Sequence, residues 1–208
     1  MDNTLKPDIV FLNLSAAEFP NRELDLPREL VQLSRDDPTF KINWVPGTNT
    51  KTMKKVFPIL PLVEEDDLLI YIDDDFLLPM GFVQNRVDDF IHHGCRHAIS
   101  AWCGNLKNTM LTMLTGFPIR CSSQPSSLVT KRMLSGYEVF YGNSDVCYRS
   151  ADDSLYTLLV TLNGFTYVRC SDYGLSQSGK CAHPIKNDFN TVSPLKTMGV
   201  FKKNGYSQ

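Results

Sequence analysis

Three consecutive acidic residues, Asp73, Asp74 and Asp75, directly follow the apolar run Leu68–Ile72. Carboxylates crowded at the end of a buried strand repel one another. Because Mg²⁺ and Mn²⁺ prefer carboxylate oxygens, a hard divalent cation would relieve this repulsion. In an extended segment Asp73 and Asp75 point the same way, so both can reach one ligand. The alternative is a solvated turn that caps the helix expected at Pro79.

A second acidic pair, Asp152 and Asp153, begins a segment whose leucines follow helical spacing. A helix dipole keeps a carboxylate in the first turn ionised, which a general base needs. Aspartate is also a common helix N-cap, and the pair taken by itself favours that structural role.

A cluster of three lysines is a weaker candidate. Lys51 stands where a helix is expected to begin and could meet a diphosphate, with Lys54 and Lys55 close behind it. The stretch is not a P-loop, because the second glycine before the lysine is missing. A solvated basic face is the alternative.

A group of side chains that can bind zinc lies around residue 94, where a helix is predicted to end: His92, His93, Cys95 and His97. Because His93 and His97 lie on opposite sides of that helix end, they cannot bind one metal ion as helical neighbours at i and i+4. We therefore expect no zinc site here.

The chain that carries these residues has 208 residues, 42% hydrophobic and 21% charged, as in a globular protein. A net charge of −2 provides no basic excess for general binding to nucleic acid. No apolar run approaches the ~20 residues that span a bilayer. Because Met1–Lys6 is polar and lacks a signal sequence, we expect a cytoplasmic protein. Its six irregularly spaced cysteines should then be reduced.

Strands and helices are expected to alternate around the acids. Strands are expected at 8–14, 41–45, 68–72, 97–103 and 166–170, and helices at 27–33, 50–64, 79–93 and 152–162. Pro58 and Pro61 should bend the second helix. Residues 104–150 are expected to be irregular, and the chain beyond 171 loop-like. The alternation predicts an α/β fold with a mostly parallel sheet, which binds ligands outside the carboxyl ends of its strands.

A strand followed by Asp-x-Asp in an α/β chain resembles the nucleotide-sugar glycosyltransferases of the GT-A fold. The similarity includes PDIVFLNLS, INWVPG, TKTMKKVFPIL and DDLLIYIDDDFLLP between Pro7 and Pro79. It continues in ADDSLYTLLVTLNG, from Ala151 to Gly164, and in Asn187-Asp188. The chain is similar to a group of microbial and large-DNA-virus glycosyltransferases, and most like the glycosyltransferase domain of an algal chlorovirus protein.

The resemblance implies one GT-A-like, Rossmann-like domain over residues 1–208. The nucleotide-binding part would cover about 7–103 and the acceptor part about 104–208. Relatives have a further strand and loop before the first strand found here. Met1–Lys6 is too short to supply them, so either the chain is a fragment or it binds the nucleotide base differently.

The resemblance also implies roles for the acids. Asp73 would bind the nucleoside of the donor, with Asp74 beside it, and Lys51 is a candidate for the diphosphate from its place at a helix start. Mn²⁺ or Mg²⁺ would be held by Asp75 and Asp73, with His183 as a further ligand; an ordinary loop histidine is the alternative at this last position. Asp153, and after it Asp152, would be the general base near the acceptor. Some of the aromatic residues in 137–141 would face the acceptor.

The expected reaction is transfer of a sugar from a nucleoside diphosphate to a hydroxyl of a glycan or glycoprotein, with inversion. UDP-hexose or UDP-deoxyhexose is the expected donor. One alternative is another Mg²⁺-dependent phosphate enzyme, such as a nucleotidyltransferase, which would share the acids but release pyrophosphate. A non-catalytic interaction domain that keeps the fold is the other alternative.

Overall fold

The computed structural model describes residues 5–47, 51–73, 76–101, 126–141 and 152–170, and the backbone of 176–177. In chain order the elements are β1 (Val10–Ser15), η1 (Arg22–Asp25), α1 (Arg28–Asp36), β2 (Phe40–Val45), η2 (Lys51–Lys55), η3 (Leu60–Leu62), β3 (Leu68–Ile72), β4 (Phe76–Leu77), α2 (Phe82–His92), β5 (Ala98–Ser100), β6 (Ser126–Thr130), η4 (Lys131–Leu134), α4 (Glu138–Tyr141), α6 (Asp152–Leu162), β7 (Tyr167–Arg169) and β8 (Ser176–Gln177).

The strands of the described chain form three sheets. β1 and β2 pair in parallel, from Val10 opposite Phe40 to Ser15 opposite Val45. The four-stranded sheet has the order β3-β6-β5-β7. In it β6 is antiparallel to both β3 and β5, whereas β5 and β7 are parallel. The short strands β4 and β8 form an antiparallel pair. The protein is therefore a mixed α/β structure.

The expectation of a mostly parallel sheet is met only in part. β3, β5 and β7 share one direction, but β6 runs against them and separates β3 from β5. This strand lies in the region expected to be irregular. Its serines favour a loop in the sequence, yet every residue of Ser126–Thr130 is buried and paired in the sheet. Backbone pairing with two neighbours here outweighs the low strand propensity of serine.

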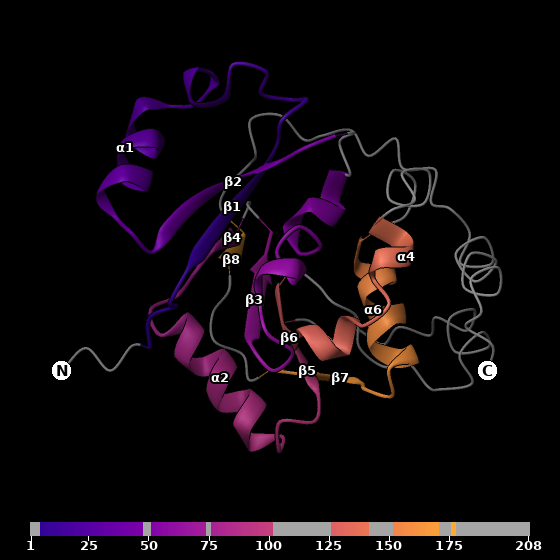
Figure 1. Ribbon diagram of the computed structural model, residues 1–208. Helices are drawn as coiled ribbons and strands as arrows, with labels where there is room; N and C mark the ends of the chain where they lie inside the picture. Colours follow the sequence, from indigo (N-terminus) through magenta and orange to yellow (C-terminus); the bar gives the residue numbers. More distant parts are fainter. Residues whose placement is uncertain are drawn as a thin grey trace.

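Helices cover both faces of the four-stranded sheet, with α2 on one side and α6 on the other (Figure 1). α6 has the bounds expected from its leucine spacing, and its Leu155, Leu158 and Leu159 are at most 2% exposed. α2 begins three residues later than Pro79, because Gly81 adopts a φ of 76° that helical geometry does not allow. Gly94, with a φ of 67°, follows its end as expected.

The prediction of a helix over 50–64 is wrong. The chain there forms two short 3₁₀ turns, η2 and η3, joined by further turns. Pro58 and Pro61 lack the amide hydrogens that a continuous α-helix requires, which explains the break. The apolar spacing still identified the buried side chains, since Met53, Phe57 and Leu60 are fully buried. β1, β2, β7 and α1 are found close to their expected ranges, with α1 extending to Asp36. Of the strand expected over 97–103, β5 covers Ala98–Ser100, and residues 102 and 103 lie outside the described part of the chain.

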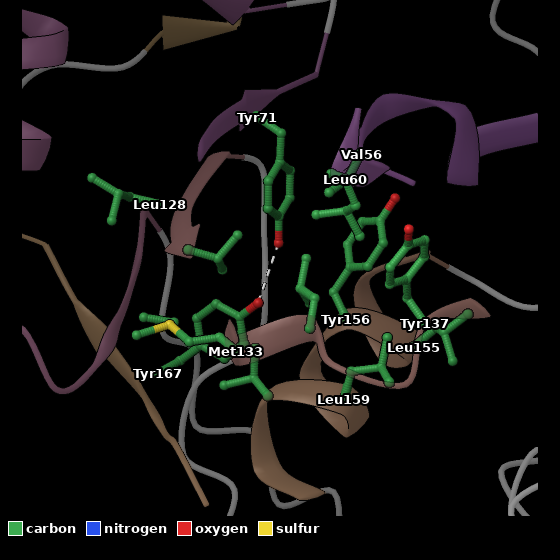
Figure 2. Packing of buried hydrophobic residues seen from close by; sticks show 14 of the residues in the cluster. Val56, Leu60, Tyr71, Leu128, Met133, Tyr137, Leu155, Tyr156, Leu159 and Tyr167 are labelled. Carbon is green, nitrogen blue, oxygen red and sulfur yellow. Dashed lines mark hydrogen bonds between the residues drawn. The ribbon is translucent and has the colours of Figure 1, made fainter. Parts of the chain in front are cut away.

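One apolar core lies between the four-stranded sheet and α6 (Figure 2). Tyr71 of β3 and Tyr156 of α6 pack edge to face, with ring centroids 5.1 Å apart. The hydroxyl groups of Tyr71 and Tyr167 lie 3.2 Å apart, a contact that links β3 to β7 across the sheet. Full burial of each leucine in this core contributes about 1.5–3 kcal/mol. The core thereby fixes α6 against the strand that ends at Ile72. Among the described helices, none is long and apolar enough to cross a bilayer.

Candidate functional site

β3 delivers Asp73 to the carboxyl end of the four-stranded sheet. The strand spans Leu68–Ile72, and Tyr71 within it is packed into the core at 7% exposure. Asp73 is the next residue, and its side chain is 33% exposed. Its carboxylate therefore stands at the edge where open α/β sheets bind ligands. Asp74 and Asp75, and with them the expected alignment of Asp73 with Asp75, lie outside the described residues.

α6 brings Asp152 to the same place. The helix begins at Asp152, whose side chain is 10% exposed, and the following turns are anchored in the core by Leu155 and Leu159. A carboxylate in the first helical turn is stabilised by the unpaired backbone N–H groups there. The first residue of α6 is thus held at a set distance from β3 by packing that lies one to two turns away.

Lys55 joins the two acids. Its Nζ donates to Asp152 Oδ2 at 2.8 Å and also to Asp73 Oδ1, and both contacts are ion pairs. The Lys55 side chain is only 26% exposed. Since each carboxylate is within hydrogen-bond distance of the same nitrogen, their nearest oxygens lie no more than about 6 Å apart. Three segments distant in the chain, η2, β3 and α6, therefore meet at one ammonium group.

The electrostatics of this contact favour the charged lysine. Burial lowers the pKa of Lys55, but the charge of Asp152 and hydrogen bonds to both carboxylates outweigh it and raise the pKa well above its usual range. Lys55 accordingly stays protonated at neutral pH. Two carboxylates share one ammonium group, so these three side chains carry a net negative charge, which a cation can use.

The segment η2, which carries Lys55, contacts both the two-stranded sheet and α6. Asn13 of β1 donates from Nδ2 to the Lys55 carbonyl at 3.1 Å, and Asn43 of β2 donates to Asn13 Oδ1 at 2.8 Å. From the other side, the Tyr156 hydroxyl of α6 lies 3.5 Å from the Met53 carbonyl in η2. The two-stranded sheet and α6 together position the lysine that contacts the acids.

The structure brings together only some of the residues expected at the site. Asp73 and Asp152 share Lys55, which the sequence reasoning did not select. Lys51 opens η2 with a φ of 50°, four positions before Lys55. Asp153 follows Asp152 in α6 and is half-buried, and its carbonyl accepts a 2.6 Å hydrogen bond from Thr157 Oγ1. His183, like Asp74 and Asp75, lies outside the described residues.

The only signal for Lys55 in the sequence is the basic run after Gly47. The neighbouring Lys54 pairs with Glu18 instead, where both side chains are more than a fifth exposed. Spacing alone does not separate these two lysines, because a 3₁₀ turn directs consecutive side chains about 120° apart.

The donor chemistry at the site fits a hard divalent cation. Asp73 and Asp152 present carboxylate oxygens, the ligands that Mg²⁺ and Mn²⁺ prefer. No group of three His, Cys, Asp or Glu side chains that could hold a metal occurs among the described residues. Within this part of the chain the two acids are the candidate ligands, and the positive charge beside them belongs to Lys55.

The histidines near the end of α2 and the aromatic residues of 137–141 make contacts away from the acid–lysine site. The rings of His93 and His97 pack edge to face, and His97 Nδ1 lies 2.8 Å from Thr166 Oγ1. In the aromatic stretch 137–141, Tyr137 and Phe140 are buried in the core, whereas Tyr141 is half-buried. Most of this stretch therefore has a packing role.

Comparison of the chain with protein-family models, with curated proteins and with solved structures found no match in any of the three.

Proposed function

We propose that this protein is a metal-dependent glycosyltransferase. It would transfer a hexose or deoxyhexose from a nucleoside diphosphate to a hydroxyl of a glycan or glycoprotein, with inversion at the anomeric carbon. UDP is the nucleotide that we propose first. The GT-A-like fold, the donor and the acceptor belong to this proposal and follow from the resemblance described above. The observation that supports it is the meeting of Asp73, after β3, with Asp152, at the start of α6, on either side of Lys55.

This meeting matters because the resemblance assigns the two acids to different halves of the reaction. Asp73 belongs to the donor side, where its carboxylate would bind the nucleoside. The Asp152–Asp153 turn belongs to the acceptor side. A transferase must hold donor and acceptor within bonding distance of each other. The helix packing that places α6 beside the end of β3 supports the proposal, because it brings the two acids assigned to donor and acceptor together.

The chemistry asked of the chain is limited. A carboxylate of the Asp152–Asp153 turn, Asp153 first, accepts the proton of the acceptor hydroxyl. The freed oxygen forms a bond to the anomeric carbon as the bond from that carbon to the diphosphate oxygen breaks. Mg²⁺ or Mn²⁺, when bound, neutralises the charge on the leaving diphosphate. The general base contributes roughly 10²–10⁴-fold to the rate.

The test is to incubate the full chain with a panel of nucleotide sugars, with Mn²⁺ or with EDTA. Thermal stabilisation identifies the nucleotide that binds, because a ligand raises apparent stability by mass action. Product analysis then separates the alternatives. A glycosyltransferase releases nucleoside diphosphate, and a nucleotidyltransferase releases pyrophosphate. A non-catalytic interaction domain releases neither product.

A matched pair of variants locates the activity. Asp73→Asn removes the donor-side carboxylate and should abolish metal-dependent nucleotide binding. Asp36→Asn, at the end of α1, removes an exposed carboxylate that bonds only Gln32 among the contacts described for it, and should leave binding unchanged. Equal nucleotide binding by both variants would contradict the site assignment.

A further inference from the structure

We propose that Lys55 is an exchangeable counter-ion of this site: it neutralises Asp73 and Asp152 in the ligand-free protein, yields them to the divalent cation, and then pairs with the diphosphate. The inference rests on the proposed function and extends it to how the site changes its partners during binding.

The first step follows from the geometry of the contacts. Lys55 Nζ already stands between the two carboxylates that are candidate ligands of the cation. A divalent ion bound by these oxygens would lie a few Å from the ammonium group. Like charges at such separations repel appreciably even at the effective dielectric constant of a partly buried site. The metal and Lys55 therefore compete for the same two acids.

The second step follows from the burial of Lys55. Its side chain is only 26% exposed, so loss of both carboxylate partners would leave a charge that water solvates incompletely. A diphosphate arriving with the metal is the anion available at that moment. Lys55, Asp73 and Asp152 together carry a net charge of minus one, and a bound divalent cation changes the sum to plus one. The two phosphate charges of a nucleotide sugar then restore it to minus one, the value without ligand.

The third step concerns which part of the lysine moves. The Lys55 carbonyl is fixed by Asn13, and η2 is held against α6 through Met53 and Tyr156. The side chain has four rotatable bonds and a compact ammonium group. Exchange of partners therefore requires rotation of the side chain and no movement of the segment.

The experiment measures two affinities with opposite expected changes. Binding of Mn²⁺ alone is followed by electron paramagnetic resonance of the free ion, and binding of UDP at saturating Mn²⁺ by calorimetry. Lys55→Gln should bind Mn²⁺ alone about tenfold more tightly or better, because the competing charge is gone. The same variant should bind UDP with Mn²⁺ about tenfold more weakly or worse, because a charge-assisted contact to phosphate is lost.

Two variants serve as controls. Lys54→Gln removes the neighbouring charge of η2, which pairs with Glu18 and not with the two acids, and should change neither affinity. Lys55→Arg keeps the positive charge and should bind Mn²⁺ alone with the same affinity as the unaltered chain. If Lys55→Gln does not fold without metal, Mn²⁺ should restore its fold, and failure to do so overturns the proposal.

The outcomes separate the possibilities. Weaker binding of both ligands by Lys55→Gln would mean that the lysine only holds the site together, and tighter binding of both would mean that it never meets the diphosphate. Either result overturns the exchange. If the unaltered chain binds none of the nucleoside diphosphates of the panel at any Mn²⁺ concentration, the proposed function fails together with the diphosphate step. If UDP binds but Lys55→Gln does not alter the affinity for Mn²⁺ alone, the exchange fails and the proposed function stands.

Discussion

Lys55 donates a 2.8 Å hydrogen bond to Asp152, a residue 97 positions later in the chain. The contact is possible because η2 and α6 pack on the same core, with Met53 and Tyr156 in it. It also ties the first turn of α6 to the end of β3, since Lys55 reaches Asp73 as well. The ion pairs that stabilise this part of the fold thus involve two of the acids to which the proposed function assigns a role.

Asp153→Asn should reduce sugar transfer by roughly 10²–10⁴-fold, because an amide cannot accept the proton of the acceptor hydroxyl. Donor and metal affinity should stay near those of the unaltered chain. Single-turnover transfer and calorimetry with UDP and Mn²⁺ measure the two quantities. Full transfer activity in this variant would reject Asp153 as the base.

Asp152→Asn should instead lower stability, because its carboxylate is the less exposed of the two that bind Lys55. Asp73 remains as a partner, so the expected loss is about 1–3 kcal/mol in the free energy of unfolding. Chemical denaturation measures this loss, with Asp153→Asn as the comparison. Loss of transfer in the folded fraction of Asp152→Asn alone, with its affinity for Mn²⁺ unchanged, would move the base assignment to this residue.

Asp75→Ala should abolish Mn²⁺-dependent donor binding and leave the fold intact. The described pairing of β3 with β6 runs from Leu68 to Ile72 and so ends before this residue. We expect the free energy of unfolding to change by no more than about 0.5 kcal/mol. Calorimetry with UDP-sugar and Mn²⁺, beside a denaturation curve, tests both statements. An unchanged affinity would remove Asp75 from the metal site.

Stability at alkaline pH should report the Lys55 ion pairs. The pKa of Lys55 in the folded chain lies above the ordinary 10.5 because of Asp152 and Asp73. Their contribution is therefore complete below the unfolded pKa and is lost as the pH rises through the higher folded value. The difference in free energy of unfolding between the unaltered chain and Lys55→Gln should be constant from about pH 7 to about pH 10 and shrink above that range. A difference that falls already between pH 7 and 9 would contradict this assignment.

Two cysteines should differ in reactivity. Cys95 is exposed and Cys170 is buried, and both are free thiols. Burial raises the pKa of Cys170, with Arg86 partly opposing the effect, so little reactive thiolate forms at neutral pH. Iodoacetamide should therefore label Cys95 rapidly in the native protein and Cys170 only after denaturation, as read by peptide mass spectrometry. Equal labelling of the two in the native state would show that Cys170 is more open than its burial implies.

The sequence predicted the elements that carry the acids better than it predicted their neighbours. β3 and α6 have the expected bounds, because a continuous apolar run and a leucine stripe with acids in its first turn are strong local signals. Lys55 could not be chosen over Lys54, since its partners are distant in the chain and only packing brings them close. β6 was missed because its burial comes from both neighbouring strands, whereas its own serines favour a loop.

The position of β6 also determines the order in which the protein can assemble. Within the described sheet β3 pairs with β6, and β5 pairs with β6 and β7, so both strands find their partners in segments that are translated after them. While the ribosome has not yet passed Thr130, the strand that carries Asp73 lacks this neighbour, and α6 is still to come. Such non-local pairing slows folding and leaves apolar strands exposed in the meantime. A nascent chain shortened before Ser126 should thus be a client for chaperones, and one that extends through Leu162 should be able to form the acid–lysine contact.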